Sequence, residues 1–217
     1  MDNLPYINDR IVKEKTELID GKVYMMSPRP RVTHALAAGN IFREFSIHLR
    51  GKKCTAFCDG VDVFLDDKNR FVPDVMIVCN LDIIKEDGIH GAPDLVVEVL
   101  SKTSAQQDKG RKREIYGKAG VKEYWIVDTW GKYIEVYYNR NGWLVLDNTY
   151  FYYTEEEKRE NEALPDGDKD KAEIFDTIKL SVCDKFEVEL KYLFEKISII
   201  QKSRKNLQSC GIFVLCF

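Results

Sequence analysis

Residues 91–137 decide the fold and read GAPDLVVEVLSKTSAQQDKGRKREIYGKAGVKEYWIVDTWGKYIEVY. Apolar runs at 94–101 and 123–128 flank a basic segment, Ser104 to Lys118, that has the length and spacing of a helix. Gly120 is a typical residue just after a helix end. A third apolar run, 132–139, follows a turn. The pattern predicts two strands joined by a helix and then a hairpin strand, as found in α/β sheets.

Upstream of this stretch, the turn signal Asp20-Gly21 predicts a β-hairpin with strands at Thr16–Ile19 and Lys22–Met26. Apolar residues spaced three to four apart predict a helix over Val32–Leu49. Two strands are expected in GVDVFLDD and in FVPDVMIVC, at 60–67 and 71–79. The central strands are nearly continuous apolar runs, which predicts a mixed sheet buried between helices.

Downstream, the highly charged stretch 154–171 predicts a solvated excursion or disordered loop. Residues 174–197 predict a strand followed by a short helix. We therefore expect one domain over residues 1–196 and a C-terminal tail of unclear role at 197–217. The tail does not continue the preceding pattern.

The composition is that of an ordinary globular chain, which excludes collagen-like and wholly disordered proteins. Lys and Arg total 33 and Asp and Glu total 36, so the net charge is −3. This balance argues against a protein that coats nucleic acid through its overall charge, because such a protein would be strongly basic. The chain shows neither a signal peptide nor an apolar run long enough to span a membrane, which predicts a cytoplasmic protein without a membrane partner.

The six cysteines are expected to be reduced thiols in such a compartment. They lack the paired spacing of a zinc finger. They are Cys54, Cys58, Cys79, Cys183, Cys210 and Cys216.

Two acids stand within apolar runs that predict neighbouring strands, Asp74 in FVPDVMIVC and Glu98 in DLVVEVLS. A carboxylate buried without a partner costs several kcal/mol, roughly, so each needs a cation, hydrogen-bond donors or a metal ion. Each alone could simply pair with a Lys or Arg or face water at a strand end. Together they form a suitable oxygen cage for Mg²⁺, which can polarise a phosphodiester and activate water.

Asp94 is a competing candidate for one of these two places and a possible accessory residue, because it shares a strand face with Glu98. Four residues of strand span roughly 13 Å, however, which is too far for both acids to bind one ion directly. Asp94 follows Pro93 and is better explained as a cap or turn residue. On the following helix, Asp108, Lys112 and Tyr116 are four residues apart and share a face. A lysine on that face could reach the strand carboxylates, or it could simply face water.

Three motifs together resemble the Uma2 family of putative restriction endonucleases, which belongs to the PD-(D/E)XK nuclease superfamily. They are VPDV, PDLVVEVLS and AGVKEYWIVD, at 72–75, 93–101 and 119–128. The resemblance extends over roughly residues 14–196 and is thin after 150. It implies a restriction-endonuclease-like core, with a mixed central β-sheet flanked by helices and an N-terminal β-hairpin.

The resemblance also implies site residues. Asp74 and Glu98 match the two metal-binding acids of the superfamily, and a lysine normally follows the second acid by two residues. Position 100 is Leu instead, so Lys112 on the next helix is the expected substitute, with Lys102 and Lys109 as alternatives.

Two further positions match the family near the site. Glu17 could be a further metal ligand or a partner of one, or else an exposed acid of the hairpin. His34 could contact phosphate or water, or serve as a structural histidine.

The expected activity is that of a Mg²⁺- or Mn²⁺-dependent endonuclease with DNA as its substrate. Cutting both strands commonly uses two active sites, so a homodimer is one expectation. Leu100 and the slightly acidic charge equally fit an inactive nuclease-fold module that binds nucleic acid or protein. A metal-dependent hydrolase of another phosphodiester is a third option.

Overall fold

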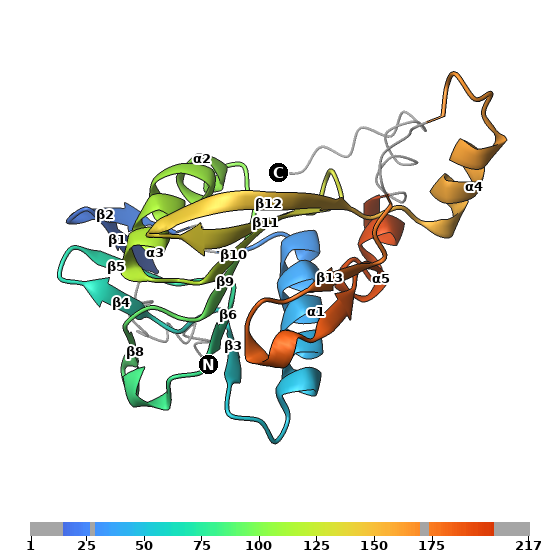
Figure 1. Cartoon of the computed structure of the whole chain (residues 1–217). Coiled ribbons are helices and arrows are strands. Elements are labelled where there is room, and N and C mark those ends of the chain that lie inside the picture. Colours follow the sequence, from blue (N-terminus) through green and yellow to red (C-terminus); the bar gives the residue numbers. More distant parts are fainter. Residues whose placement is uncertain (1–14, 27–28, 170–173, 202–217) are drawn as a thin grey trace, which may run out of the picture.

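A six-stranded mixed sheet forms the centre of the computed structural model, which describes residues 15–26, 29–169 and 174–201 (Figure 1). The strands β9 and β10 pair in parallel, and the other neighbours pair antiparallel. In sheet order the strands are β12 (Trp143–Phe151), β11 (Tyr133–Arg140), β10 (Glu123–Asp128), β9 (Leu95–Val99), β6 (Val75–Val78) and β3 (Thr55–Cys58). The parallel pair is the strand–helix–strand unit that the sequence predicts.

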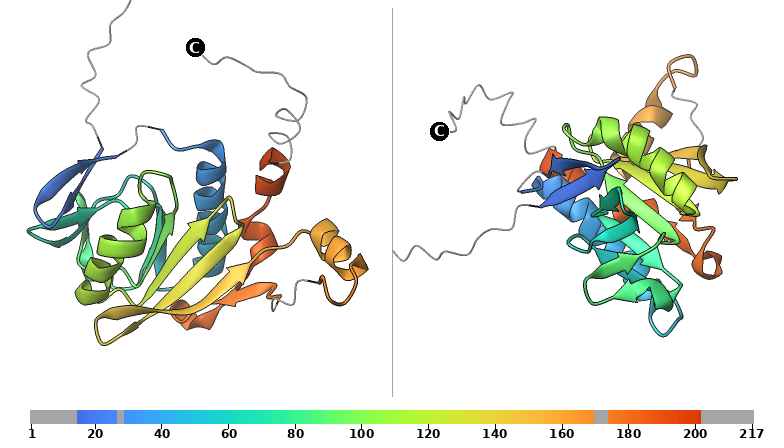
Figure 2. Two further views of the ribbon diagram at one scale, coloured as in Figure 1. Left: turned by 90° about the horizontal axis from the view of Figure 1, so that it is seen from above. Right: turned by 90° about the vertical axis from the view of Figure 1, so that its left-hand side faces the viewer.

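Helices cover both faces of this sheet, as the two views in Figure 2 show. One face packs on α1 (Val32–Leu49), whose bounds are those predicted. The other face lies under a helical segment that was expected to be one helix. It consists of α2 (Ala105–Gln107), the π-helical turn η2 (Asp108–Lys112) and α3 (Arg113–Ala119), closed by Gly120 in the left-handed region.

A second six-stranded sheet lies beside the α3 face and begins with the predicted hairpin. Both Asp20 and Gly21 have positive φ, as a tight hairpin turn requires. The hairpin strand β1 pairs with β5, which carries the chain toward Asp74 and the central sheet. The sheet order is β2 (Lys22–Met25), β1 (Thr16–Ile19), β5 (Asn69–Phe71), β4 (Val63–Asp66), β8 (Gly88–His90) and β7 (Ile84–Lys85), with the short 3-10 turn η1 (Leu81–Ile83) before β7.

The charged stretch after residue 150 is a solvated excursion, which was one of the two predictions for it, but the other prediction, a disordered loop, is wrong for its first part. Thr154 and Glu157 form a capping box that starts helix α4 (Glu155–Ala163), which projects from the body of the molecule (Figure 1). Reciprocal caps satisfy the free N–H groups of the first turn, and acids there oppose the positive end of the helix dipole. Charge alone therefore did not indicate disorder.

The C-terminal part is a small hairpin followed by a short helix. The sequence predicted the short helix but expected a single strand in place of the hairpin. Its elements are β13 (Thr177–Lys179), the 3-10 turn η3 (Cys183–Lys185), β14 (Glu187–Glu189) and α5 (Leu190–Leu193). This part packs beside α1 and contributes Ile178, Leu180 and Leu193 to the core. Ile197, the first residue of the predicted tail, is also fully buried. Most of that tail, from residue 202 on, lies outside the described residues.

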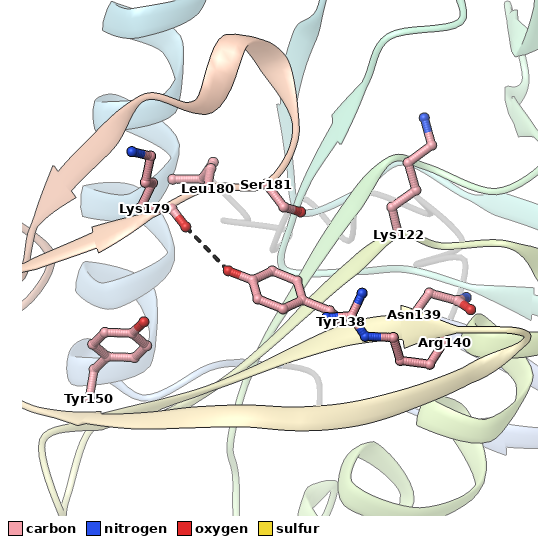
Figure 3. A pocket seen from close by; sticks show the side chains of 8 residues that line it. All are labelled: Lys122, Tyr138, Asn139, Arg140, Tyr150, Lys179, Leu180 and Ser181. Carbon is pink, nitrogen blue, oxygen red and sulfur yellow. Dashed lines mark hydrogen bonds between the residues drawn. The ribbon is translucent and has the colours of Figure 1, made fainter.

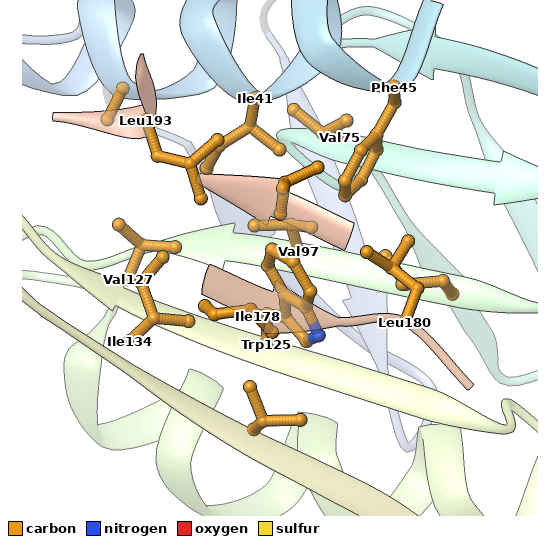
Figure 4. Packing of buried hydrophobic residues seen from close by; sticks show 14 of the residues in the cluster. Ile41, Phe45, Val75, Val97, Trp125, Val127, Ile134, Ile178, Leu180 and Leu193 are labelled. Carbon is orange, nitrogen blue, oxygen red and sulfur yellow. The ribbon is translucent and has the colours of Figure 1, made fainter. Parts of the chain in front are cut away.

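Alternate residues of the central strands divide the core into two clusters. Val97 and Trp125 point toward α1 and the C-terminal hairpin, whereas Val96 and Tyr124 point toward α3. Figure 4 shows the first cluster, in which side chains of α1, the sheet and the C-terminal hairpin meet around Trp125. Burial on both faces explains the nearly continuous apolar runs of these strands. The architecture is the mixed α/β fold that the sequence predicted.

Cys54 and Cys79 form a disulfide, so the expectation of reduced thiols is wrong for this pair in the structure. The antiparallel register of β3 and β6 pairs Thr55 with Val78. One residue further along, the same register sets Cys54 directly opposite Cys79. Cysteine spacing in the sequence cannot reveal this, because the pairing depends on which strands are neighbours.

Close approach of α3 to the β11–β12 turn yields a testable prediction at Gly117. A Cβ atom there would lie 2.7 Å from the Gly142 carbonyl oxygen and 3.2 Å from the Leu144 nitrogen. Gly117→Ala should therefore lower the free energy of unfolding by about 1–3 kcal/mol, measured by urea denaturation. Gly110→Ala is the matched control, because nothing lies within 4 Å of that position. It should be neutral or stabilising by up to about 1 kcal/mol, and equal losses in the two variants would contradict the packing argument.

Within the part of the chain that the structure describes, no helix combines the length and hydrophobicity that a bilayer crossing demands.

Candidate active site

The ammonium of Lys112 lies among three buried carboxylates that come from three different elements. Its Nζ is 2.7 Å from Glu98 Oε1 of β9, 3.0 Å from Glu17 Oε1 of β1 and 3.3 Å from Asp108 Oδ1 of η2. The Lys112 side chain is 4% exposed. We call these four residues the Lys112 cluster.

The helical segment after β9 presents its buried face to the strands. Asp108, Lys112 and Tyr116 lie on that face, as the four-residue spacing predicts, and all three are buried. The Tyr116 hydroxyl donates to Glu98 Oε1 at 3.1 Å. Single π-helical turns within α-helices occur frequently at functional sites, and here η2 carries both Asp108 and Lys112.

Backbone amides and an aromatic ring complete the surroundings of the cluster. The Val72 N–H donates to Glu17 Oε1 at 3.1 Å, so Glu17 is a buried, fixed acid of the hairpin. The ring of Phe71 lies 5.5 Å from Lys112 Nζ, within cation–π range. Sequence reasoning missed these contacts, because a backbone amide and a core aromatic leave no local signal.

Asp74 lies at the bend just before β6, so it precedes the strand that was expected to contain it. Its Oδ2 accepts a hydrogen bond from the Val99 N–H at 2.7 Å. The register that pairs Val75 with Val97 continues to Asp74 opposite Glu98. The two predicted metal-binding acids are therefore neighbours across two adjacent strands.

His34, near the start of α1, lies beside Asp74. Its Nε2 is 3.3 Å from Asp74 Oδ2, and both side chains are mostly buried. Burial disfavours the imidazolium, but the hydrogen bond and charge of Asp74 outweigh it and raise the pKa of His34. The predicted accessory histidine is thus positioned next to the first acid.

Burial dominates the electrostatics of the cluster. Loss of water raises the pKa of Glu98 well above its usual range, despite the attraction of Lys112, and raises the pKa of Asp108 as well. Burial acts against the charge of Lys112 too, but the surrounding carboxylates, Glu98 foremost, hold the pKa of Lys112 well above its usual value. Lys112 therefore stays charged, and its single positive charge faces three carboxylates, which is too little to compensate all of them.

This shortage of positive charge is the observation on which a metal ion can be tested. Glu17, Glu98 and Asp108 contact one ammonium, Asp74 acts on Glu98 from nearby, and buried carboxylates require compensation. Asp108 Oδ1 is buried and accepts no hydrogen bond, although Lys112 is near. No three of these carboxylates meet within 4.8 Å of one another in the described part of the chain. Mg²⁺ needs only one or two carboxylates together with water and phosphate oxygens, so Asp74 and Glu98 fit it.

Asp94 does not belong to this site. It lies at the other end of β9, where its Oδ1 is 2.6 Å from Lys122 Nζ and its Oδ2 accepts from the Cys79 N–H at 2.7 Å. Its position does not support a place beside Glu98 in the site, either as a competitor or as an accessory residue, and the prediction of a cap or turn residue at the strand entry describes it better. Among the other candidate lysines, Lys109 pairs with Glu135 at 2.7 Å.

A pocket of about 490 Å³ lies outside the Lys112 cluster, between the β11–β12 ribbon and the C-terminal hairpin (Figure 3). None of the predicted site residues lines it. The Tyr138 hydroxyl donates to the Lys179 carbonyl oxygen across this space. The lining residues are Lys122, Tyr138, Asn139, Arg140, Tyr150, Lys179, Leu180 and Ser181.

Comparison with known proteins gives three similarities. The model of the Uma2 family, described as putative restriction endonuclease, matches residues 8–169. An uncharacterized protein of Synechocystis sp., slr1290, is 29% identical over 139 residues, which cover 62% of this chain and 73% of that protein. The crystal structure of a putative nuclease belonging to DUF820 from Anabaena variabilis superposes with a TM-score of 0.60 at 16% identity, covering 84% of this chain and 90% of that one. The last similarity shows a shared fold.

Proposed function

Because the chain belongs to the Uma2 family of putative restriction endonucleases, we propose that it is a metal-dependent endonuclease that hydrolyses DNA phosphodiester bonds. The observation that carries the proposal is the Lys112 cluster beside Asp74. A buried ammonium contacts an acid, Glu98, that lies across the strand register from a second acid. Two carboxylates and a lysine thus lie together near one end of the central sheet, and such a set could hold a divalent ion and orient a water.

Asp74 and Glu98 would hold Mg²⁺ or Mn²⁺. The bound ion would stabilise charge on the phosphate and lower the pKa of an attacking water. Lys112, held by Glu98, would orient that water for attack in line with the leaving oxygen. Lys112 thus takes the place of the lysine that is absent at position 100, where Leu packs against the core.

The neighbours of these three residues keep them in position. Glu17 fixes the lysine from the hairpin side, and Tyr116 donates to Glu98 from the helix. His34 touches Asp74 and would contact a phosphate oxygen or a water of the substrate complex. Substrate binding by such a chain depends on local positive groups, since the net charge is −3.

Divalent-metal binding tests the proposal directly. Calorimetry with Mn²⁺ should show one site per chain in the wild type and at least about tenfold weaker binding in Asp74→Ala, since even outer partners of a metal commonly contribute that much. Asp66→Ala is a suitable control, because Asp66 lies in β4, outside the site, where its carboxylate accepts hydrogen bonds from the Asn69 side chain. Equal affinities of wild type and Asp74→Ala would show that the metal assignment is wrong.

Nicking of supercoiled plasmid with Mn²⁺ tests the activity itself. Cleavage that depends on both the metal and Asp74 supports the endonuclease. Small phosphodiesters assayed in parallel would reveal a preference for a substrate other than DNA.

An inactive binding module is the second candidate, and Leu100 is the observation that favours it. In that case the Lys112 cluster would be a structural ion-pair network. The module should bind DNA or a protein partner without metal-dependent cleavage, whereas nicking by the wild type and not by Asp74→Ala would exclude it.

A further inference from the structure

Three cysteine side chains converge at the end of the central sheet opposite the Lys112 cluster. The Sγ atoms of Cys54, Cys79 and Cys183 all lie within 4.8 Å of one another. Within the described ranges, this is the one group of three or more His, Cys, Asp or Glu side chains that meets this spacing. All three residues are partly exposed and pack against the edge of the core.

The sulfurs come from three separate segments of the chain. Cys54 precedes β3 and Cys79 follows β6, and the two face each other across the strand pair. Cys183 comes from η3 of the C-terminal hairpin, and its Sγ lies 3.2 Å from that of Cys79. A disulfide uses two of these sulfurs and leaves the third against them as a free thiol.

The backbone around Cys183 adopts a conformation that needs support from its surroundings. Cys183 and Asp184 have φ of 56° and 65°, in the left-handed region that non-glycine residues seldom occupy. Two such residues in succession persist where neighbouring contacts hold them. This turn directs Cys183 toward the other two cysteines.

We propose that the reduced forms of Cys54, Cys79 and Cys183 together bind one zinc ion. Thiolates are the ligands that suit zinc, with Zn–S distances of about 2.3 Å. Tetrahedral geometry at that distance separates the sulfurs by roughly 3.8 Å, which side-chain rotation from the present positions can supply. Three protein ligands leave the fourth position to water, consistent with the partial exposure of the cysteines.

The charge around the three thiols also suits a dication. The carboxylates of Asp94, Glu123 and Asp184 lie near Cys183, as does the ammonium of Lys122. A zinc ion is attracted by these carboxylates. Bound zinc would fasten the C-terminal hairpin to the ends of β3 and β6.

Loading the site requires the disulfide to open first. A dithiol reductant donates two electrons and two protons to the Cys54–Cys79 bond and is itself oxidised to a disulfide. Zinc then displaces the protons of the thiols that it binds. The oxidised protein keeps two of its three ligands in a covalent bond and cannot form the site.

Calorimetry with Zn²⁺ on the full chain, reduced with a dithiol and then freed of it without air, tests this proposal. The wild type should bind one zinc in competition with a chelator, and Cys183→Ser should bind at least about tenfold more weakly. Cys58→Ser is the matched control, because Cys58 is an exposed free cysteine outside the group. It should bind as the wild type does, and so should the double variant C210S/C216S.

The assignment would be overturned if the reduced wild type bound no zinc, if Cys183→Ser bound zinc as tightly as the wild type, or if Cys58→Ser or the C210S/C216S variant lost as much affinity as Cys183→Ser. Oxidised protein should bind no zinc at this site, and undiminished binding would also contradict it. The outcome is independent of the proposed nuclease site, because hard Mn²⁺ favours carboxylates and Asp74→Ala leaves all three thiols intact.

Discussion

Lys112→Ala should lower the free energy of unfolding by about 3–5 kcal/mol, because it removes the ammonium shared by three buried carboxylates. Glu98, Glu17 and Asp108 would then be left in a site from which water is excluded. Urea denaturation followed by fluorescence or circular dichroism measures this loss. The variant should also lose metal-dependent nicking, if Lys112 orients the attacking water.

Lys118→Ala is the matched control for this variant, because Lys118 is exposed on the same helical segment and pairs with Glu114. It should change the free energy of unfolding by less than about 0.5 kcal/mol. The double variant Lys112→Ala with Glu98→Gln should recover part of the stability, since one of the stranded charges is gone. A loss below about 1 kcal/mol in Lys112→Ala would mean that water or a proton compensates the acids without the lysine.

Glu98→Gln should lower the rate of Mn²⁺-dependent nicking by roughly 10²–10³-fold, the effect typical of removing one preorganised electrostatic group from an active site. The substitution keeps the shape of the side chain and its ability to accept the Tyr116 hydroxyl bond. Burial makes the ionised form of Glu98 costly and raises its pKa, so the site should tolerate a neutral Gln in its place. The fold should therefore survive while the charge that binds metal is lost.

The comparison that separates catalysis from folding is nicking and urea denaturation on the same preparations. Glu114→Gln serves as control, because Glu114 lies on the surface of α3 and pairs with Lys118. It should nick at the wild-type rate. If Glu98→Gln also nicked at that rate, Glu98 would be a structural acid, and the metal would have to be held elsewhere.

The apolar runs of the central strands made the fold predictable from sequence. Their burial on both faces follows from α1 on one side and α3 on the other, and the helix over Val32–Leu49 was found at the expected bounds. Local signals also placed the β1–β2 hairpin, because Asp20-Gly21 fits a tight turn. The helix α4 was missed, since its capping box lies in a stretch whose charge suggested a loop.

The candidate site was predictable in part. An acid within a buried strand, Glu98, and a lysine on a helix face with Asp108 and Tyr116 could be recognised from sequence period alone. Strand pairing then brought Asp74 opposite Glu98, and the hairpin delivered Glu17 to Lys112. Asp94 shares a strand with Glu98 but lies at its other end, next to Lys122.

The sequence by itself determined the first hairpin, the long helix α1, the central strands β6, β9, β10 and β11, the faces that these elements bury and the residues whose burial would need compensation. These properties follow from the periods of helix and strand, which are local. Tertiary structure alone decided which segments, distant in sequence, share one site. Packing and sheet register bridge the sequence separations of 95 from Glu17 to Lys112 and of 104 from Cys79 to Cys183, which no local spacing records.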